Sequence, residues 1–216
     1  ATFAYHRGHV ALCCQLRKGR PLQARKCSRV IVSGAVAERN GISVAIFYHH
    51  LYFCGNSDGN MPGYIGNSNV GNYDAWVAKY DSDGNRLWIS QFGSSGSESL
   101  YGIGVLSSGS LVLAGYTSGS FEGFTNAGGW DALVANMTDS GSLGAVVQFG
   151  TSGDEKAISP LAVAPSDAFY ATGWIEGGNF AGYSGNTGQE DTWIARFNSK
   201  LEQEYVVQFG TSSDEV

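Results

Sequence analysis

The residues that could carry chemistry in this chain are, first, carboxylates that return at a fixed spacing. The repeated aspartates are Asp74, Asp131 and Asp191, and the acidic elements that follow them are Glu98, Asp154-Glu155 and Asp214-Glu215. General acid and base catalysis needs two carboxylates in different surroundings at one site, whereas these recur in matched surroundings. We therefore expect each aspartate to accept backbone N–H bonds that fix the turn before a strand. A calcium ion shared between repeats is the alternative.

A second candidate is the oxygen-rich segment at 81–85. It begins like a calcium-binding loop, but the twelfth position holds Phe92 where such a loop needs a glutamate. The corresponding segments of the other repeats, 139–141 and 198–200, share only turn-forming residues with it. We expect a hairpin turn and no cofactor. Calcium remains the alternative, and its ligands would be Asp81, Asp83 and Asn85.

Neither a nucleophile nor a structural zinc site is indicated. The G-x-S-x-G pattern occurs only in shifted form at 93–96, and every histidine lies at or before His50, so no catalytic residue is assigned. The N-terminal part contains residues that could form a soft-metal cluster, namely His6, His9, Cys13, Cys14 and Cys27. Because no C-x-x-C pair is present, incidental thiols and imidazoles are the favoured interpretation.

All but the N-terminal residues belong to a sequence that repeats three times. An Asp-Ala-Trp-Val-Ala pattern at 74–78 returns at 131–135 and 191–195, with spacings of 57 and 60 residues. Gln-Phe-Gly follows each time, at 91–93, 148–150 and 208–210. A period of this length predicts an array in which each unit buries its apolar face mainly against its neighbours.

Each repeat is predicted to form four short strands. They are 42–46, 51–55, 74–80 and 86–92 in the first copy, 102–106, 111–116, 131–137 and 143–149 in the second, and 158–164, 168–174, 191–197 and 204–209 in the third. Short β-rich runs between Gly, Ser, Asn and Asp clusters are typical of an all-β fold. Four strands per unit favour tandem blades of a β-propeller-like array. The aromatic residues expected in its core are Trp76, Trp88, Trp193, Phe92, Phe149 and Phe209.

The segments 73–88, 91–98 and 111–117 together resemble the SBBP type of β-propeller repeat. In that family a D-A-[FW]-V-A-K-x-D-x-x-G-x-x-x-W strand pair is followed by a G-[GT]-x-G-x-[DE] loop and a G-x-x-V-x-G-[YW]-T strand. The resemblance covers about 41–216, as repeats 41–101, 102–157 and 158–216, with departures at 54–57 and 197–200. It implies a repeat scaffold often found in secreted or cell-surface proteins, with no common catalytic residue.

The number of copies raises the question of closure. Propellers close with about four to eight blades, and this chain has three recognisable copies followed by the beginning of a further loop at 211–216. An unclosed array would leave strand edges and blade faces exposed. We therefore expect either a piece of a longer protein or a chain that closes by assembly, for example as a homodimer.

Composition and charge limit the classes of partner that the chain is expected to bind. Apolar residues make up 43% of the chain, which is ample for a core, and no apolar run approaches the roughly 18 residues of a membrane helix, so no integral membrane segment is expected. Residues 1–40 hold eight of the 13 basic and one of the 19 acidic residues, which leaves five basic and 18 acidic residues, a net charge of −13, in 41–216. The repeat region is therefore not expected to bind nucleic acid, and the basic segment is expected to be a solvated tail or linker.

The sequence thus favours a non-enzymatic scaffold or interaction module that binds a protein partner through loops at one rim of the blades. The long connectors 57–72, 118–129 and 176–189 would form that surface. Candidate ligand-binding residues are Tyr116, Phe124, Trp174 and Tyr183. The first alternative is a carbohydrate-binding module, suggested by the aromatic and Asn-rich connectors. The second is a fragment of a propeller-fold hydrolase or lyase, which would need an acid pair or metal site unique to one repeat.

Overall fold

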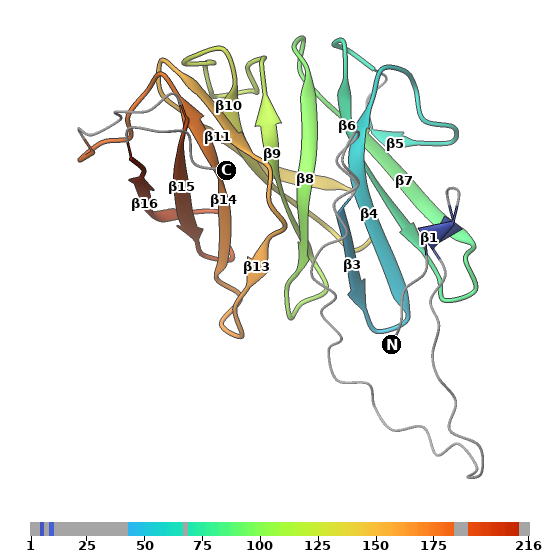
Figure 1. Cartoon of the computed structure of the whole chain (residues 1–216). Coiled ribbons are helices and arrows are strands. Elements are labelled where there is room, and N and C mark those ends of the chain that lie inside the picture. The colour runs from blue at the N-terminus through green and yellow to red at the C-terminus, as the bar shows by residue number, and fades with distance from the viewer. Residues whose placement is uncertain (1–4, 7–8, 11–42, 67–68, 184–189, 212–216) are drawn as a thin grey trace.

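A computed structural model describes residues 5–6, 9–10, 43–66, 69–183 and 190–211 of this protein (Figure 1). In these ranges the regular secondary structure consists of strands, without a helix. None of the sheets formed by the described residues closes into a barrel. The prediction of an all-β chain is confirmed. Of the basic segment 1–40, only a short ribbon of β1 (Tyr5–His6) and β2 (His9–Val10) is described.

Three larger sheets follow one another along the chain. The first contains β3 (Ser43–Phe47), β4 (His50–Ser57), β6 (Asp74–Tyr80), β7 (Arg86–Phe92) and the edge strand β5 (Ile65–Gly66). The second contains β8 (Glu98–Val105), β9 (Leu111–Thr117), β10 (Asp131–Met137) and β11 (Leu143–Phe149). The third contains β12 (Asp154–Ala157), β13 (Ala162–Val163), β14 (Phe169–Glu176), β15 (Glu190–Phe197) and β16 (Gln203–Phe209).

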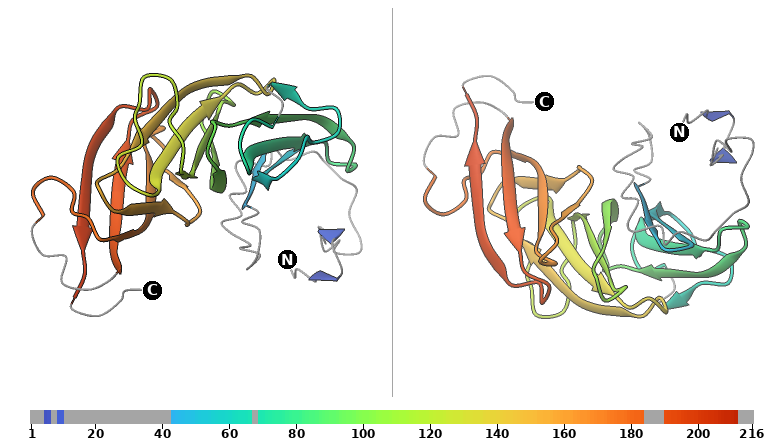
Figure 2. Two further views of the ribbon diagram at one scale, coloured as in Figure 1. Left: turned by 90° about the horizontal axis from the view of Figure 1, so that it is seen from above. Right: turned by 90° about the horizontal axis from the view of Figure 1, so that it is seen from below.

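The sheets lie side by side along an open curve (Figure 2). Apolar side chains fill the space between neighbouring sheets. One core lies between the first and second sheets, where Tyr52 and Val77 meet Leu113 and Leu133. A separate core lies between the second and third sheets. Paired strands within each sheet run antiparallel, except that β5 pairs with β7 in parallel. The fold is therefore a series of sheets packed face to face.

The two inner strands of the middle sheet, β9 and β10, are buried on both faces, which accounts for their almost continuous apolar sequences. Alternate residues of a strand point to opposite faces. In β9, Leu111 and Leu113 belong to the core shared with the first sheet, while Val112 and Ala114 belong to the core shared with the third. The same alternation holds along β10. A strand covered on both sides loses the polar half of the usual alternating pattern.

Strand ends agree with the sequence prediction where the repeat motif is strong and differ at the first strand of the later sheets. β6, β7, β10 and β11 have the predicted bounds. β8 starts at Glu98 instead of 102, through an irregularity between Leu100 and Gly102. The single strand predicted over 158–164 is wrong, because β12 and β13 are separate pieces on either side of Pro160, which has no N–H to donate to β14.

The third hairpin turn has a leucine at the position where the other two turns have a glycine. Gly84 and Gly141 adopt positive φ in the first two turns, with their N–H groups bonded to Asp81 and Thr138. In the third turn Leu201 takes this place with φ of +66°, and its N–H bonds to Asn198. Its side chain is only 3% exposed. Packing of Leu201 into the core thus compensates for a backbone conformation that disfavours leucine.

The outer face of the third sheet corrects one prediction about the core. Phe92 and Phe209 are repeat equivalents, yet Phe92 is 3% exposed and Phe209 is 51% exposed. The second sheet covers Phe92, whereas among the described residues no further sheet follows β16. Tyr205 and Val207 are exposed on the same strand. Of the other predicted core aromatics, Trp193 is buried, while Trp76, Trp88 and Phe149 are half-buried.

Candidate functional site

The connectors that the sequence singled out are each held by the glutamine of the Gln-Phe-Gly motif. The buried amide of Gln148 accepts a bond from the Phe121 N–H at 3.1 Å and donates to the Gly119 carbonyl at 2.9 Å. It also donates to Oδ2 of Asp131 at 2.9 Å. One side chain on β11 thus fixes both the start of the connector and the aspartate at its end.

In the other two repeats the equivalent glutamine also binds the connector backbone. Gln91 accepts a bond from the Met61 N–H at 2.8 Å, and Gln208 accepts one from the Phe180 N–H at 3.0 Å. Gln208 also donates to Asp191 at 2.9 Å. The sequence showed that the glutamine recurs but did not reveal its role, because the backbone groups that it binds lie about 30 residues away.

The strand-opening aspartates do what the sequence predicted in the first two repeats. Asp74 accepts bonds from the N–H groups of Val70 and Gly71, at 3.1 and 3.3 Å, and Asp131 accepts one from Ala127 at 3.0 Å. All three aspartates are buried, including Asp191. Their recurrence therefore follows from their role in closing the connectors.

The acidic residues after the glycine loops have a structural role at the junctions between sheets. Glu98 accepts bonds from the Ser94 N–H at 2.9 Å, the Ser94 hydroxyl at 2.5 Å and the Thr117 hydroxyl at 2.6 Å. Burial raises the pKa of Glu98, and the nearby Asp74 raises it further. A Cβ on Gly93 would lie 2.5 Å from both carboxylates, so only glycine fits between them.

The next junction repeats this arrangement with Glu155, which binds the Thr151 N–H and hydroxyl, and whose pKa is also raised by burial. Gly150 separates its carboxylate from that of Asp131. Asp214-Glu215 lies outside the described residues. Two such carboxylate pairs in matched surroundings are the pattern expected of residues with a structural role.

The segment at 81–85 forms the predicted hairpin turn between β6 and β7. Asp81 Oδ1 accepts bonds from the N–H groups of Asp83 and Asn85, each at 2.9 Å, and Oδ2 accepts one from the Asn85 side chain. The Asn85 side chain, followed by the backbone donors, lowers the pKa of Asp81. Within the described ranges, His, Cys, Asp and Glu side chains do not gather in threes as a metal site would require.

The N-terminal metal candidates are described only in part. The backbones of His6 and His9 are paired in the register of the β1–β2 ribbon, and Cys13, Cys14 and Cys27 lie outside the described residues. Cys54 is a free thiol buried in the first core, and burial raises its pKa to about 12. A thiol with so high a pKa is a poor nucleophile and a poor metal ligand.

Two of the four ligand-binding candidates meet at one place. Tyr116 and Trp174 lie on neighbouring sheets and enclose Lys156 together with Trp130. The Lys156 Nζ lies 5.3 Å from the centre of the Tyr116 ring, 4.9 Å from that of Trp130 and 4.8 Å from that of Trp174. Sequence reasoning missed Trp130 and Lys156. The available signal was that Trp130 directly precedes a strand-opening aspartate.

Phe124 and Tyr183 lie elsewhere, at equivalent turns in the second and third connectors. The N–H of each bonds to the carbonyl of an aromatic residue three positions earlier, at 2.9 and 3.1 Å. Both side chains are half-buried. They belong to the connector surface without contributing to the group around Lys156.

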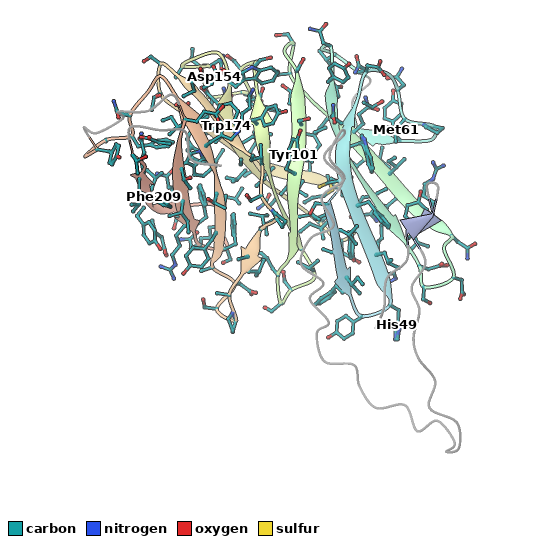
Figure 3. The ribbon with its side chains drawn as sticks, viewed as in Figure 1. His49, Met61, Tyr101, Asp154, Trp174 and Phe209 are labelled. Carbon is teal, nitrogen blue, oxygen red and sulfur yellow. The ribbon has the colours of Figure 1, made fainter. Side chains whose placement is uncertain are left out.

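A pocket of about 270 Å³ opens at the junction of the first and second sheets. Its lining consists of Asn56, Tyr73, Ser97, Glu98, Ser99, Tyr101, Tyr116 and Trp130. The Tyr101 and Tyr116 rings stack at 5.5 Å, and Tyr116 meets Trp130 edge to face at 5.0 Å. Tyr101, Trp174 and the connector residue Met61 lie towards the same end of the sheets, opposite His49 (Figure 3).

Comparison with known proteins does not place this chain in a family. It matches no family model, and it has no significant sequence match among curated proteins. Among solved structures, a protein of unknown function from Bacteroides caccae is similar at 12% identity with a TM-score of 0.36, over 77% of this chain and 61% of that one. The aligned part is less than two thirds of that protein's length. Across the described ranges, no helix has the length and apolar character needed to cross a membrane.

Proposed function

We propose that this protein is a non-enzymatic interaction module that binds a protein partner at the connector end of its sheets. The observation that carries the proposal is the group of aromatic side chains gathered there from two sheet junctions. Its members are Tyr73, Tyr101, Tyr116, Trp130 and Trp174. Aromatic residues are enriched in protein interfaces, because they bury a large area with few rotatable bonds and retain a polar atom at the rim.

The proposal includes the architecture: the three sheets are consecutive blades of a propeller-like array of the SBBP repeat type. In support, each sheet has four consecutive antiparallel strands as its body and packs face to face on the next. The connectors leave every sheet between its second and third main strands, so they emerge at a common end. Rigid strands with variable connectors at one end form a surface suited to recognition.

The state of the acidic residues supports binding over catalysis. The carboxylates of Glu98 and Asp74 are both occupied by hydrogen bonds within their junction. The equivalent pair of Glu155 and Asp131 is engaged in the same way. An acid pair that recurs at successive junctions does not offer the two contrasting environments that a hydrolase or lyase site requires.

The test compares two surface tyrosines of similar exposure at different places. Tyr73 at the connector end is 46% exposed, and Tyr205 on β16 is 43% exposed. Partner proteins are captured from the native source with the wild-type chain, a Tyr73→Ser/Phe124→Ser variant and a Tyr205→Ser control. We expect one partner to be retained by the wild type and control and lost by the double variant. Equal recovery by all three chains would refute the assignment of the binding surface.

The pocket supports carbohydrate binding as a second candidate function. Its aromatic rings lie beside the side chains of Asn56, Ser97 and Ser99, and ring faces combined with amide and hydroxyl groups suit a sugar. A glycan array probed with the wild type and a Tyr101→Ala variant tests this function. Binding that requires Tyr101 would support it, and an array without signal would count against it.

A further inference from the structure

The two junctions between sheets carry equivalent sites, one filled and one open. In the second junction Lys156 on β12 pairs with Trp174 on β14, and Trp130 bridges to Asp154. In the first junction Ser99 pairs with Tyr116, and Tyr73 bridges to Ser97. The backbone register is thus the same, and Ser99 stands where the second junction has Lys156.

In the second junction the protein's own lysine fills the site. The Lys156 ammonium group lies within 5.3 Å of three aromatic ring centres. An ammonium group this close to a ring centre is attracted by the negative face of the ring, and each contact contributes about 0.5–2 kcal/mol. Among the described residues, the ion pairs found do not include Lys156, so the rings are its identified partners.

In the first junction the corresponding space is open. Ser99 lacks the long alkylammonium chain that Lys156 has at the equivalent position. The pocket lies beside Ser99, which is part of its lining. Its volume of about 270 Å³ is just below the roughly 300–1,000 Å³ of small-molecule sites, which suits a single side chain. Tyr73 and Tyr101 form its aromatic wall together with Tyr116 and Trp130, whose rings also contact Lys156. Asn56, in the same lining, stands where the second junction has Tyr116.

We propose that this pocket binds a lysine side chain of a protein partner, with the ammonium group placed as that of Lys156 is in the second junction. This proposal deepens the proposed function and rests on it for the source of the lysine. Charge favours it, since 41–216 carries five basic and 18 acidic residues and will attract a cationic side chain.

The experiment titrates the chain with the peptide acetyl-Gly-Gly-Lys-Gly-Gly-amide and follows the indole N–H signal of Trp130 by NMR. A peptide with norleucine in place of lysine is the uncharged control and should bind about tenfold more weakly, given the size of cation–π attraction. Ser99→Lys should fill the pocket from within and weaken lysine-peptide binding at least tenfold. Lys156→Ser should open the second junction and raise the number of bound peptides from one to two.

Several results would overturn the proposal. The proposal fails if the wild type shows no saturable binding of the lysine peptide, or if the norleucine peptide binds with the same affinity. It also fails if the Ser99→Lys variant, with an unchanged circular dichroism spectrum, binds the lysine peptide with an affinity within twofold of the wild type. Free pentylamine binding as tightly as the peptide would exclude a protein source. The peptide titration uses no partner protein, so the two experiments can fail separately. If the peptide does not bind, the capture experiment still tests the proposed function. If capture fails but the peptide binds, the pocket is an ammonium site without an identified protein partner.

Discussion

Replacing Gln148 with methionine tests the role of the repeated glutamine as the residue that holds a connector in place. The substitution keeps the length of the side chain but removes the bonds to the Phe121 N–H, the Gly119 carbonyl and Asp131, all between 2.9 and 3.1 Å. A buried hydrogen bond contributes about 1 kcal/mol net, so we expect the free energy of unfolding to fall by about 3 kcal/mol. For a chain of this size, that corresponds to a Tm lower by about 6–12 °C.

Urea unfolding followed by tryptophan fluorescence measures the loss, and hydrogen exchange at the Phe121 amide shows where it occurs. Gln208→Met is the matched control, because its bond to the Gly178 carbonyl is longer, at 3.4 Å, and we expect it to cost about 2 kcal/mol. The reasoning fails if Gln148→Met costs less than about 0.5 kcal/mol, if Gln208→Met costs more, or if the Phe121 amide keeps its protection.

Four further predictions follow from the described geometry. Burial raises the pKa of Glu98 above its ordinary value of 4.5, so its stabilising contribution is present below that value and lost as the pH rises through the folded pKa. Glu98→Gln should therefore gain stability relative to wild type as the pH rises above 4.5, and a constant difference would contradict this. Partial burial acts to raise the pKa of Asp139, but hydrogen bonds from Lys79 and Tyr52 lower it overall, so its contribution is present above pH 3.8 and lost on acidification. Asp139→Ala should cost about 1–2 kcal/mol at pH 7 in urea unfolding, because buried Lys79 loses its carboxylate while Asp139 itself is half exposed. Tyr48→Gly should raise Tm by about 2 °C in calorimetry, because Tyr48 has φ of +54° at the first position of a two-residue turn, where glycine is favoured; a lower Tm would refute this. Because Phe209 is exposed on β16, light scattering should give a mass above 22.9 kDa that Phe209→Asp returns to 22.9 kDa, and a wild-type monomer at high concentration would contradict this.

The sequence by itself determined the repeat, the all-β class and most strand bounds to within one residue. These follow from local chemistry: apolar runs of strand length, turn residues between them and motifs that return at a fixed period. β6 and β10 have the predicted ends because the strand-opening aspartate and the following turn mark both boundaries in the sequence. The role of Asp74 could be predicted for the same reason, since its partners Val70 and Gly71 lie within four residues.

Only the tertiary structure decided what depends on contacts between sheets. Gln148 and Phe121 are 27 residues apart, and the rings around Lys156 come from two sheets, so neither arrangement has a local signal. The exposure of Phe209 was mispredicted because a strand sequence does not say whether another sheet covers its face. Ser99 and Lys156 look like unrelated substitutions in the sequence. The strand register shows that they occupy equivalent positions at the two junctions. The lysine fills its site, and the serine leaves the other site open.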